Sequence, residues 1–186
     1  MNRLLLFPGA GSASTHPSLL AIESAVAPMP VVRADFPYRK AGRKAPDRPP
    51  VLLQAVRDEA AALLVGLGTG DGLVLGGRSM GGRICSLVVG DEFDPLAAKG
   101  LVLICYPLHP PGRPQRLRVE HFPRLTVPCL FISGTKDAFG TPDELSHWTA
   151  TIPGPVTHEW MVGKGHDLKG CDQSIALLVA AWVSAL

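Results

Sequence analysis

A chain of 186 residues with 46% hydrophobic residues can bury a sizeable core, and its net charge of +2 is too small to indicate a nucleic-acid partner. Its basic residues are also scattered, without the stripe interleaved with aromatic residues that nucleic-acid binding favours. Four isolated cysteines give neither a zinc-ligand spacing nor a disulfide framework, so we expect no metal and no other cofactor.

The terminal segments indicate where the protein resides. Only a few apolar residues precede Pro8, fewer than a signal peptide needs. The longest apolar run, Ile175–Val183, is well short of the ~18 residues of a membrane span. We therefore expect a cytoplasmic protein that makes no membrane contact, folds as a single domain over residues 1–186 and keeps its thiols reduced. The sequence leaves a homodimer open.

The first part of the chain alternates apolar runs with segments of helical periodicity. Its first apolar run stops at Pro8–Gly11, which is typical of a buried strand that enters a tight turn. Pro37–Pro50 is rich in proline and basic residues, which predicts a surface loop, and its closure over a site stays open. In this order we predict a strand over 3–7, a helix over 17–26, a strand over 31–36 and a helix over 51–67.

The rest of the chain continues the alternation. Thr141-Pro-Asp-Glu144 is a helix start, with threonine as N-cap, proline at the first helical position and glutamate three residues on. Apolar runs that alternate with helices indicate a parallel sheet covered on both faces. We predict strands over 73–75, 100–105, 128–133 and 156–162, the last an edge strand, with helices over 80–89, 116–122, from 141 onward and over 172–186.

Gly77-Arg78-Ser79-Met80-Gly81 matches the nucleophile-elbow pattern G-x-S-x-G between a strand and a helix. The two glycines suit a turn so sharp that strand and helix backbones nearly touch. Ser79 Oγ would then stand above the carboxyl end of the sheet, and the Met80 amide would point at developing negative charge. Alone, the pattern equally describes a glycine-rich turn with an idle serine.

Two further residues follow strands in the order that this architecture uses. Asp137 comes after the strand that ends near Ser133, and His166 follows the last strand. An isolated aspartate is commonly a turn residue and an isolated histidine is commonly structural, but three such residues at successive strand ends are less readily accidental. We therefore predict Ser79, Asp137 and His166 as the catalytic residues.

The glycine-rich turn after the first strand predicts the second half of an oxyanion hole. Its Ala10 amide would face that of Met80, and a tight turn alone would use the same glycines. Basic residues near the mouth would favour an acidic or polar substrate, although solvated surface positions explain most of them; they are Arg78, Arg113, Lys136 and Lys164. The predicted substrate-binding residues are Gly9, Gly11, Arg78 and His109.

Three stretches carry a resemblance to known proteins: Leu75–Arg83, Tyr106–Gly112 and Gly134–Gly140. The chain is similar to small α/β-hydrolases of the dienelactone-hydrolase-like group, and within it resembles the testis-expressed protein 30 and KANSL3-type hydrolase-like family. The resemblance implies the α/β-hydrolase fold and a Ser79–Asp137–His166 triad. Dienelactone hydrolases carry a cysteine where this chain has Ser79, which argues against a dienelactone substrate.

We therefore predict a serine hydrolase of α/β-hydrolase fold that acts on a small acyl ester or thioester. The segment between the strands at 100–105 and 128–133 is too short for a helical lid, so we expect a minimal fold without a cap domain and an open, shallow pocket. The alternative is a binding or scaffold protein with a vestigial triad, because some relatives have no assigned substrate. A peptidase of the same fold is a third reading.

Overall fold

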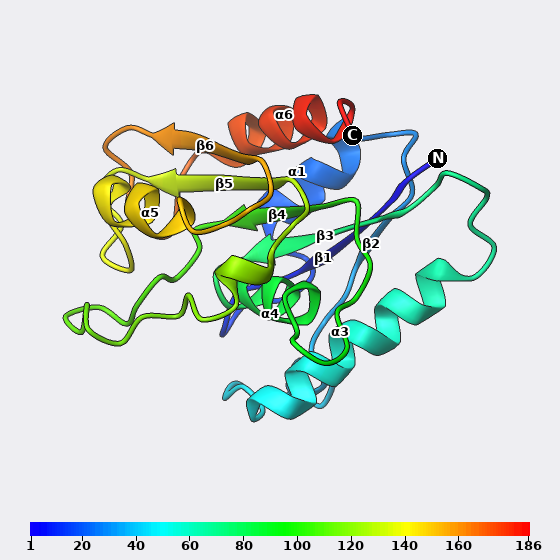
Figure 1. Cartoon of the computed structure of the whole chain (residues 1–186), viewed down its shortest axis with the longest axis horizontal. Coiled ribbons are helices and arrows are strands. Elements are labelled where there is room, and N and C mark those ends of the chain that lie inside the picture. The colour runs from blue at the N-terminus through cyan, green and yellow to red at the C-terminus, as the bar shows by residue number, and fades with distance from the viewer.

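The computed structural model describes all of residues 1–186 and arranges them around one sheet (Figure 1). Six strands, all parallel, lie in the order β2-β1-β3-β4-β5-β6. Their bounds are β1 Arg3–Phe7, β2 Val31–Arg33, β3 Leu73–Arg78, β4 Gly100–Ile104, β5 Cys129–Gly134 and β6 Val156–Met161. The predicted parallel sheet is confirmed, with β6 at its edge.

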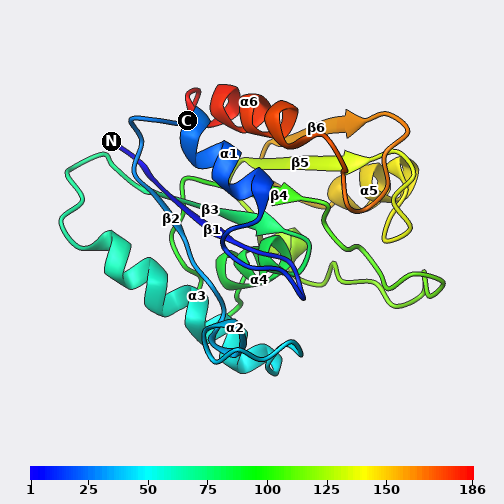
Figure 2. The same cartoon turned by 180° about the vertical axis from the view of Figure 1, so that it is seen from behind.

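Helices cover both faces of the sheet, as the sequence predicted. Figure 1 and, from behind, Figure 2 show α1 and α6 together on one face, with α3 and α4 on the other. Each face has its own apolar core, of 24 buried residues under α3 and α4 and of 17 under α1 and α6. The helices are α1 Pro17–Ala25, α2 Pro37–Lys40, α3 Pro49–Leu64, α4 Met80–Val89, α5 Pro142–Thr149 and α6 Asp172–Val183, with a 3-10 turn, η1, at Phe122–Arg124.

Two local predictions are wrong. Pro37–Pro50 is not a plain surface loop: each of its ends begins a helix at a proline, α2 at Pro37 and α3 at Pro49. The fully buried Tyr38 stacks on Phe36, whose ring lies 4.6 Å from that of Phe7, so this segment is fastened to the core.

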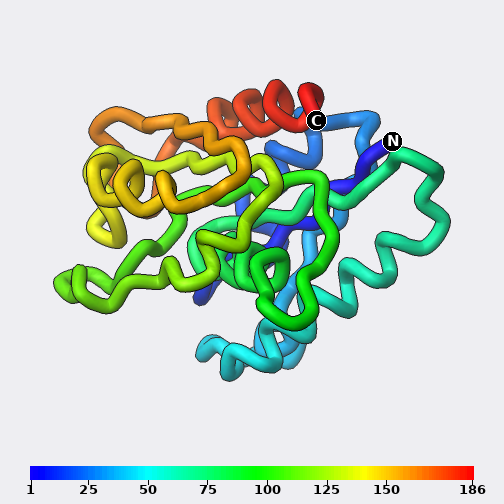
Figure 3. The backbone as a smooth tube through the Cα atoms, in the orientation of Figure 1, coloured from blue at the N-terminus to red at the C-terminus, as the bar shows by residue number.

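The predicted helix over 116–122 is also absent, since only η1 forms there. The connection from β4 to β5 loops outward from the sheet without further helix, as the trace in Figure 3 shows between its green and yellow parts. The fold therefore has no cap domain, which confirms that prediction. None of the helices has the length and apolar character needed to cross a lipid bilayer.

The strand order fixes where side chains from different strands can meet. β1 lies between β2 and β3. From β1 the chain first adds β2 at one edge of the sheet and then crosses back over β1 to add β3 on the opposite side of β1. In open parallel sheets the crevice at such a reversal, outside the carboxyl ends of the strands, is where ligands bind. Here that crevice lies between the turn after β1 and the turn after β3.

Gly77→Ala should strongly destabilise the protein. A Cβ at Gly77 would lie 2.1 Å from the carbonyl oxygen of Phe7, its partner on β1, and backbone cannot yield as a side chain does. We expect urea unfolding to show a loss of about 3 kcal/mol in the free energy of unfolding. Gly165→Ala is the control, because the only atom near its Cβ is 3.8 Å away. Equal stabilities of the two variants would contradict this packing.

Candidate active site

The turn between β3 and α4 holds Ser79 in a conformation rare for a residue with a side chain, with φ 46° and ψ −114°. Its amide donates a 2.7 Å hydrogen bond to Ile104 on β4, which keeps the turn in register with the sheet. The turn can be this sharp because glycine has no Cβ: a Cβ on Gly81 would lie 2.4 Å from the carbonyl oxygen of Phe7, which is too close. The elbow inferred from the sequence is therefore present as a strained turn.

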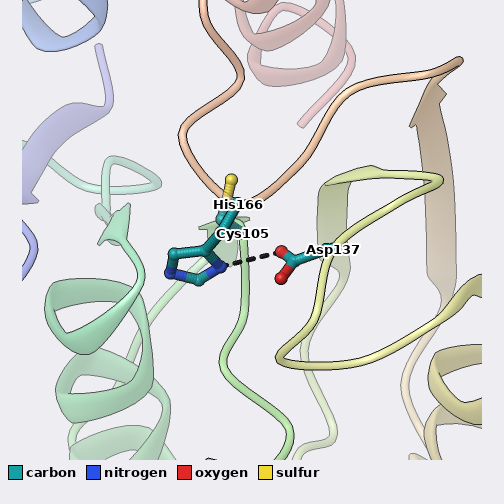
Figure 4. A group of neighbouring side chains, drawn as sticks. All are labelled: Cys105, Asp137 and His166. Carbon is teal, nitrogen blue, oxygen red and sulfur yellow. Dashed lines mark hydrogen bonds and ion pairs between the residues drawn. The ribbon is translucent and has the colours of Figure 1, made fainter. Parts of the chain in front are cut away.

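Ser79, His166 and Asp137 form a hydrogen-bonded row. Nε2 of His166 lies 2.8 Å from Ser79 Oγ, and Nδ1 lies 2.8 Å from Asp137 Oδ2. Figure 4 shows the carboxylate directed at the imidazole from the turn after β5. With Nδ1 protonated, the ring donates to Asp137 and its Nε2 accepts from the serine hydroxyl. The three residues predicted from strand ends thus come together at one edge of the sheet.

The carboxylate and the ring are both held in place by Phe139. Its amide donates a 2.8 Å hydrogen bond to Asp137 Oδ1, and its ring stacks on His166 with centroids 4.0 Å apart. Asp137 itself is buried, with 3% of its surface exposed. Sequence reasoning missed Phe139, although an aspartate that accepts from the amide two residues on is an Asx turn, a pattern that a strand–loop–helix connection favours.

Cys105 lies next to His166, and Figure 4 shows its sulfur above the imidazole ring. The sulfur, a carboxylate oxygen of Asp137 and a ring nitrogen of His166 all lie within 4.8 Å of one another. Burial raises the pKa of the Cys105 thiol to about 12, so the sulfur stays protonated. Metal binding needs a thiolate and an imidazole nitrogen that is free, whereas both nitrogens of His166 are engaged. This set of groups favours the hydrogen-bonded row over a metal site.

A cavity of about 580 Å³ opens in front of Ser79 and His166, a volume suited to a small molecule. Three of its thirteen lining residues are hydrophobic and three are arginines, so cationic groups stand among a lining whose surface is mostly apolar. The lining residues are Gly9, Ala10, Ser12, His16, Arg78, Ser79, Met80, Arg83, Pro107, Arg118, Phe139, His166 and Asp167.

Two residues predicted to bind substrate, Gly11 and His109, are not among these lining residues. His109 is buried and turned toward its own loop and α5, because Nδ1 donates to the carbonyl of Pro110 at 2.9 Å and Nε2 lies 3.4 Å from Glu144. Of the basic residues expected near the mouth, only Arg78 lines the cavity. The remaining three lie elsewhere: Arg113, Lys136 and Lys164.

Sequence reasoning also missed His16, which lines the cavity from the start of α1. Its Nδ1 accepts from the amide of Ser18 and caps the helix, and burial followed by the charge of Arg78 lowers its pKa. Arg78 in turn donates to the carbonyl of Asp167 at 2.8 Å and to Ser18 Oγ at 3.4 Å. The one signal in the sequence was the His-Pro pair before a helix, which is compatible with an N-cap but gives no hint of a cavity.

The turn after β1 lies against the elbow. A Cβ on Gly9 would touch Ser79 Cβ at 3.5 Å, and the turn closes through a hydrogen bond from Ser12 to Gly9. Ala10 and Met80, predicted as the two amide donors of an oxyanion hole, both line the cavity together with Ser79.

The strain at Ser79 predicts an order of stability for two variants. Ser79→Ala and Ser79→Gly both lose the hydroxyl, but only glycine adopts this backbone conformation without a clash. We expect Ser79→Gly to be the more stable by about 1 kcal/mol in chemical unfolding, after the entropy cost of glycine is deducted. An alanine variant as stable as the glycine variant would show that the turn carries no strain.

The whole architecture matches known proteins. Residues 1–182 match the model of the alpha/beta hydrolase domain. One similar solved structure is described as a hydrolase of the alpha/beta superfamily from Xanthomonas campestris, with TM-score 0.75, 19% identity and full coverage of both chains. Another is the RedJ thioesterase of the prodiginine pathway in Streptomyces coelicolor, with TM-score 0.69, 19% identity and coverage of 100% and 90%. A third is a monoacylglycerol lipase from Paleococcus ferrophilus, with TM-score 0.75, 13% identity and coverage of 98% and 93%. At these identities the solved structures share the fold, and the match over nearly the full length shows that this chain belongs to the alpha/beta hydrolase domain family.

Proposed function

We propose that this alpha/beta hydrolase is a serine hydrolase that cleaves a small acyl ester or thioester through an acyl-enzyme. The observation that carries the proposal is the position of His166, which is 2.8 Å from Ser79 Oγ on one side and 2.8 Å from Asp137 on the other. A nucleophile, a base and a carboxylate that orients the base are the groups that acyl transfer needs.

In the first half of the reaction, Ser79 Oγ attacks the acyl carbonyl carbon while His166 Nε2 takes the hydroxyl proton. Asp137 stabilises the imidazolium that results. The carbonyl oxygen becomes an oxyanion and accepts hydrogen bonds from the amides of Met80 and Ala10. Collapse of this intermediate breaks the bond to the alcohol or thiol, which leaves with the proton from His166.

The second half repeats these steps with water. His166 takes a proton from a water molecule, whose oxygen attacks the carbonyl of the acyl-Ser79 ester. A second oxyanion forms at the same two amides and collapses to release the carboxylic acid. The proton on His166 returns to Ser79 Oγ, so the enzyme is regenerated.

The size of the substrate follows from the connection between β4 and β5. Without a cap over it, the cavity in front of Ser79 offers about 580 Å³, which supports a short or exposed acyl group. The thioesterase and the lipase among the similar structures carry the same fold, and the choice between ester and thioester remains part of this proposal.

The alternative is a hydrolase-like protein that uses the fold for binding only. Two observations favour the enzyme. The hydrogen-bonded row is complete, and Ser79 keeps a strained backbone, which persists mainly where it serves a purpose. The narrower relationship, to the dienelactone-hydrolase-like group and the testis-expressed protein 30 and KANSL3-type family, belongs to the same proposal and rests on the three stretches of sequence described above.

We further propose a single-domain protein of the cytoplasm whose partner is its small-molecule substrate. Support for the cytoplasm comes from the four cysteines, all of them free and buried, which suit a reducing environment.

A fluorophosphonate probe should label one serine. An activated nucleophile beside an oxyanion hole attacks this reagent, so intact-mass spectrometry should show a single adduct that is lost in Ser79→Ala. Ser24→Ala is the matched control, because Ser24 is exposed on α1 and should leave labelling unchanged. Folded wild-type protein that takes up no label would favour the binding-protein reading.

Asp137→Asn should reduce turnover and leave the fold intact. The amide side chain can still accept from Phe139, but it cannot stabilise the imidazolium or hold the required tautomer. With a short activated ester, kcat should fall by about 10⁴ for Asp137→Asn and by up to about 10⁶ for Ser79→Ala. If Ser79→Ala abolishes hydrolysis of the ester but Asp137→Asn leaves kcat unchanged, Asp137 has no part in the mechanism.

A further inference from the structure

Two arginines face the cavity beside the nucleophile. Arg83 lies on α4 one turn after the elbow, where its amide bonds to the carbonyl of Ser79 at 3.0 Å. Long side chains on a helix lean toward its N-terminus, which brings this guanidinium back toward Ser79. Arg118 comes from the β4–β5 connection and lines the same cavity.

Neither guanidinium is paired with a carboxylate. The side chain of Arg83 makes no hydrogen bond, and its Nε is buried without a partner. Arg118 makes a single long one, 3.3 Å to the carbonyl of Pro107. Three other arginines do have carboxylate partners: Arg33 pairs with Glu23, Arg43 with Asp47 and Arg57 with Asp91. Both residues are only partly buried, so an anionic ligand could reach their guanidinium groups and supply the missing partner.

The two residues line the same cavity, and their positive charges repel each other. Burial lowers the pKa of Arg118, and the positive charge of Arg83 lowers it further. Such repulsion is relieved by an anion placed between two guanidinium groups. The only acidic residue that lines the cavity is Asp167, which is exposed and whose Oδ1 accepts from the amide of Lys169.

The backbone that carries Arg118 is held in place. Its carbonyl accepts a 2.6 Å hydrogen bond from the hydroxyl of the buried Tyr106, and its amide donates to Leu108 at 2.9 Å. The loop is fixed again at its far end, where Ser86 Oγ and Nε2 of the buried His121 lie 2.8 Å apart. Arg118 therefore stands on a braced segment, as a binding residue should.

We infer that Arg83 and Arg118 bind an anionic group of the substrate, a carboxylate or a phosphate, so that the hydrolysed ester or thioester is itself an acid. The planar guanidinium matches either anion through paired hydrogen bonds. The ester half of this inference rests on the proposed serine hydrolase, whereas the anion site stands on the arginines alone. Arg78 is already bonded to Asp167 and Ser18, so its role is to position the turn rather than to bind this anion.

The test compares esters that differ only in charge: 3-(butanoyloxy)benzoate, the neutral 3-(butanoyloxy)benzamide and 3-(butanoyloxy)phenyl phosphate. Wild-type protein should hydrolyse an anionic ester with the higher kcat/KM, and the better anion tells carboxylate from phosphate. Arg83→Gln should lower kcat/KM for the preferred anion by about ten- to a hundredfold, mainly through KM, and change the benzamide ester by less than about twofold.

Two matched variants separate charge from structure. Arg83→Lys should recover part of the preference, because it keeps the charge without the guanidinium fork. Arg116→Gln, on the exposed part of the loop that carries Arg118, should leave kcat/KM unchanged for the anionic and the neutral esters. Equal losses on charged and neutral esters in Arg83→Gln would overturn the inference, as would a wild-type enzyme that shows no preference.

A binding measurement tests the anion site independently of the proposed serine hydrolase activity. Calorimetry with the non-hydrolysable amides 3-(butanoylamino)benzoate, its phosphate counterpart and the neutral benzamide needs no turnover. An anionic amide should bind at least tenfold more tightly than the neutral one, and Arg83→Gln should abolish the difference. Fluorophosphonate labelling without this preference would overturn the anion site alone, and the preference without labelling would overturn only the serine mechanism.

Discussion

The close approach of three backbones around the carbonyl oxygen of Phe7 is the constraint on which the site depends. Strand β3 passes it at Gly77 and helix α4 passes it at Gly81, at distances that leave no room for a Cβ. This approach sharpens the turn until Ser79 takes a strained conformation, and it brings the loop after β1 against the elbow. The candidate nucleophile and both candidate amide donors are therefore placed by one steric condition.

Much of the fold could be predicted because its signals are local. Uniformly apolar runs are typical of buried parallel strands, the capping box at Thr141 is observed in the structure, and α4 has its predicted bounds. The predictions were wrong where contacts with residues distant in the sequence determine the local conformation. Pro37–Pro50 has the composition of a loop, but packing of Tyr38 and Phe36 beneath α3 fastens it, and no local pattern reports such a contact.

The residues of the candidate site also fall into those that local sequence signals predict and those that they do not. Ser79, Asp137 and His166 could be found because strand ends in a parallel sheet share one edge, so chain order alone predicts their meeting. Arg118 and His16 reach the cavity from an irregular loop and a helix cap. The hydroxyl of Tyr106 fixes the backbone of Arg118, and the amide of Ser18 fixes the ring of His16, and neither contact leaves a periodic pattern in the sequence. His109, predicted to bind substrate, does not line the cavity, because its loop turns it toward Glu144.

In the proposed enzyme, the braced connection between β4 and β5 would set substrate selectivity, while the turns after β3, β5 and β6 would carry out the reaction. The elbow and His166 lie in turns that directly follow strands of the sheet, whereas Arg118 and Pro107 belong to a segment that is anchored at Tyr106 and His121 and bulges outward between them. Its exposed middle carries little of the core, so sequence changes there are well tolerated. Related enzymes could therefore diverge in the compounds they accept by varying this bulge alone, with the machinery beneath it inherited unchanged.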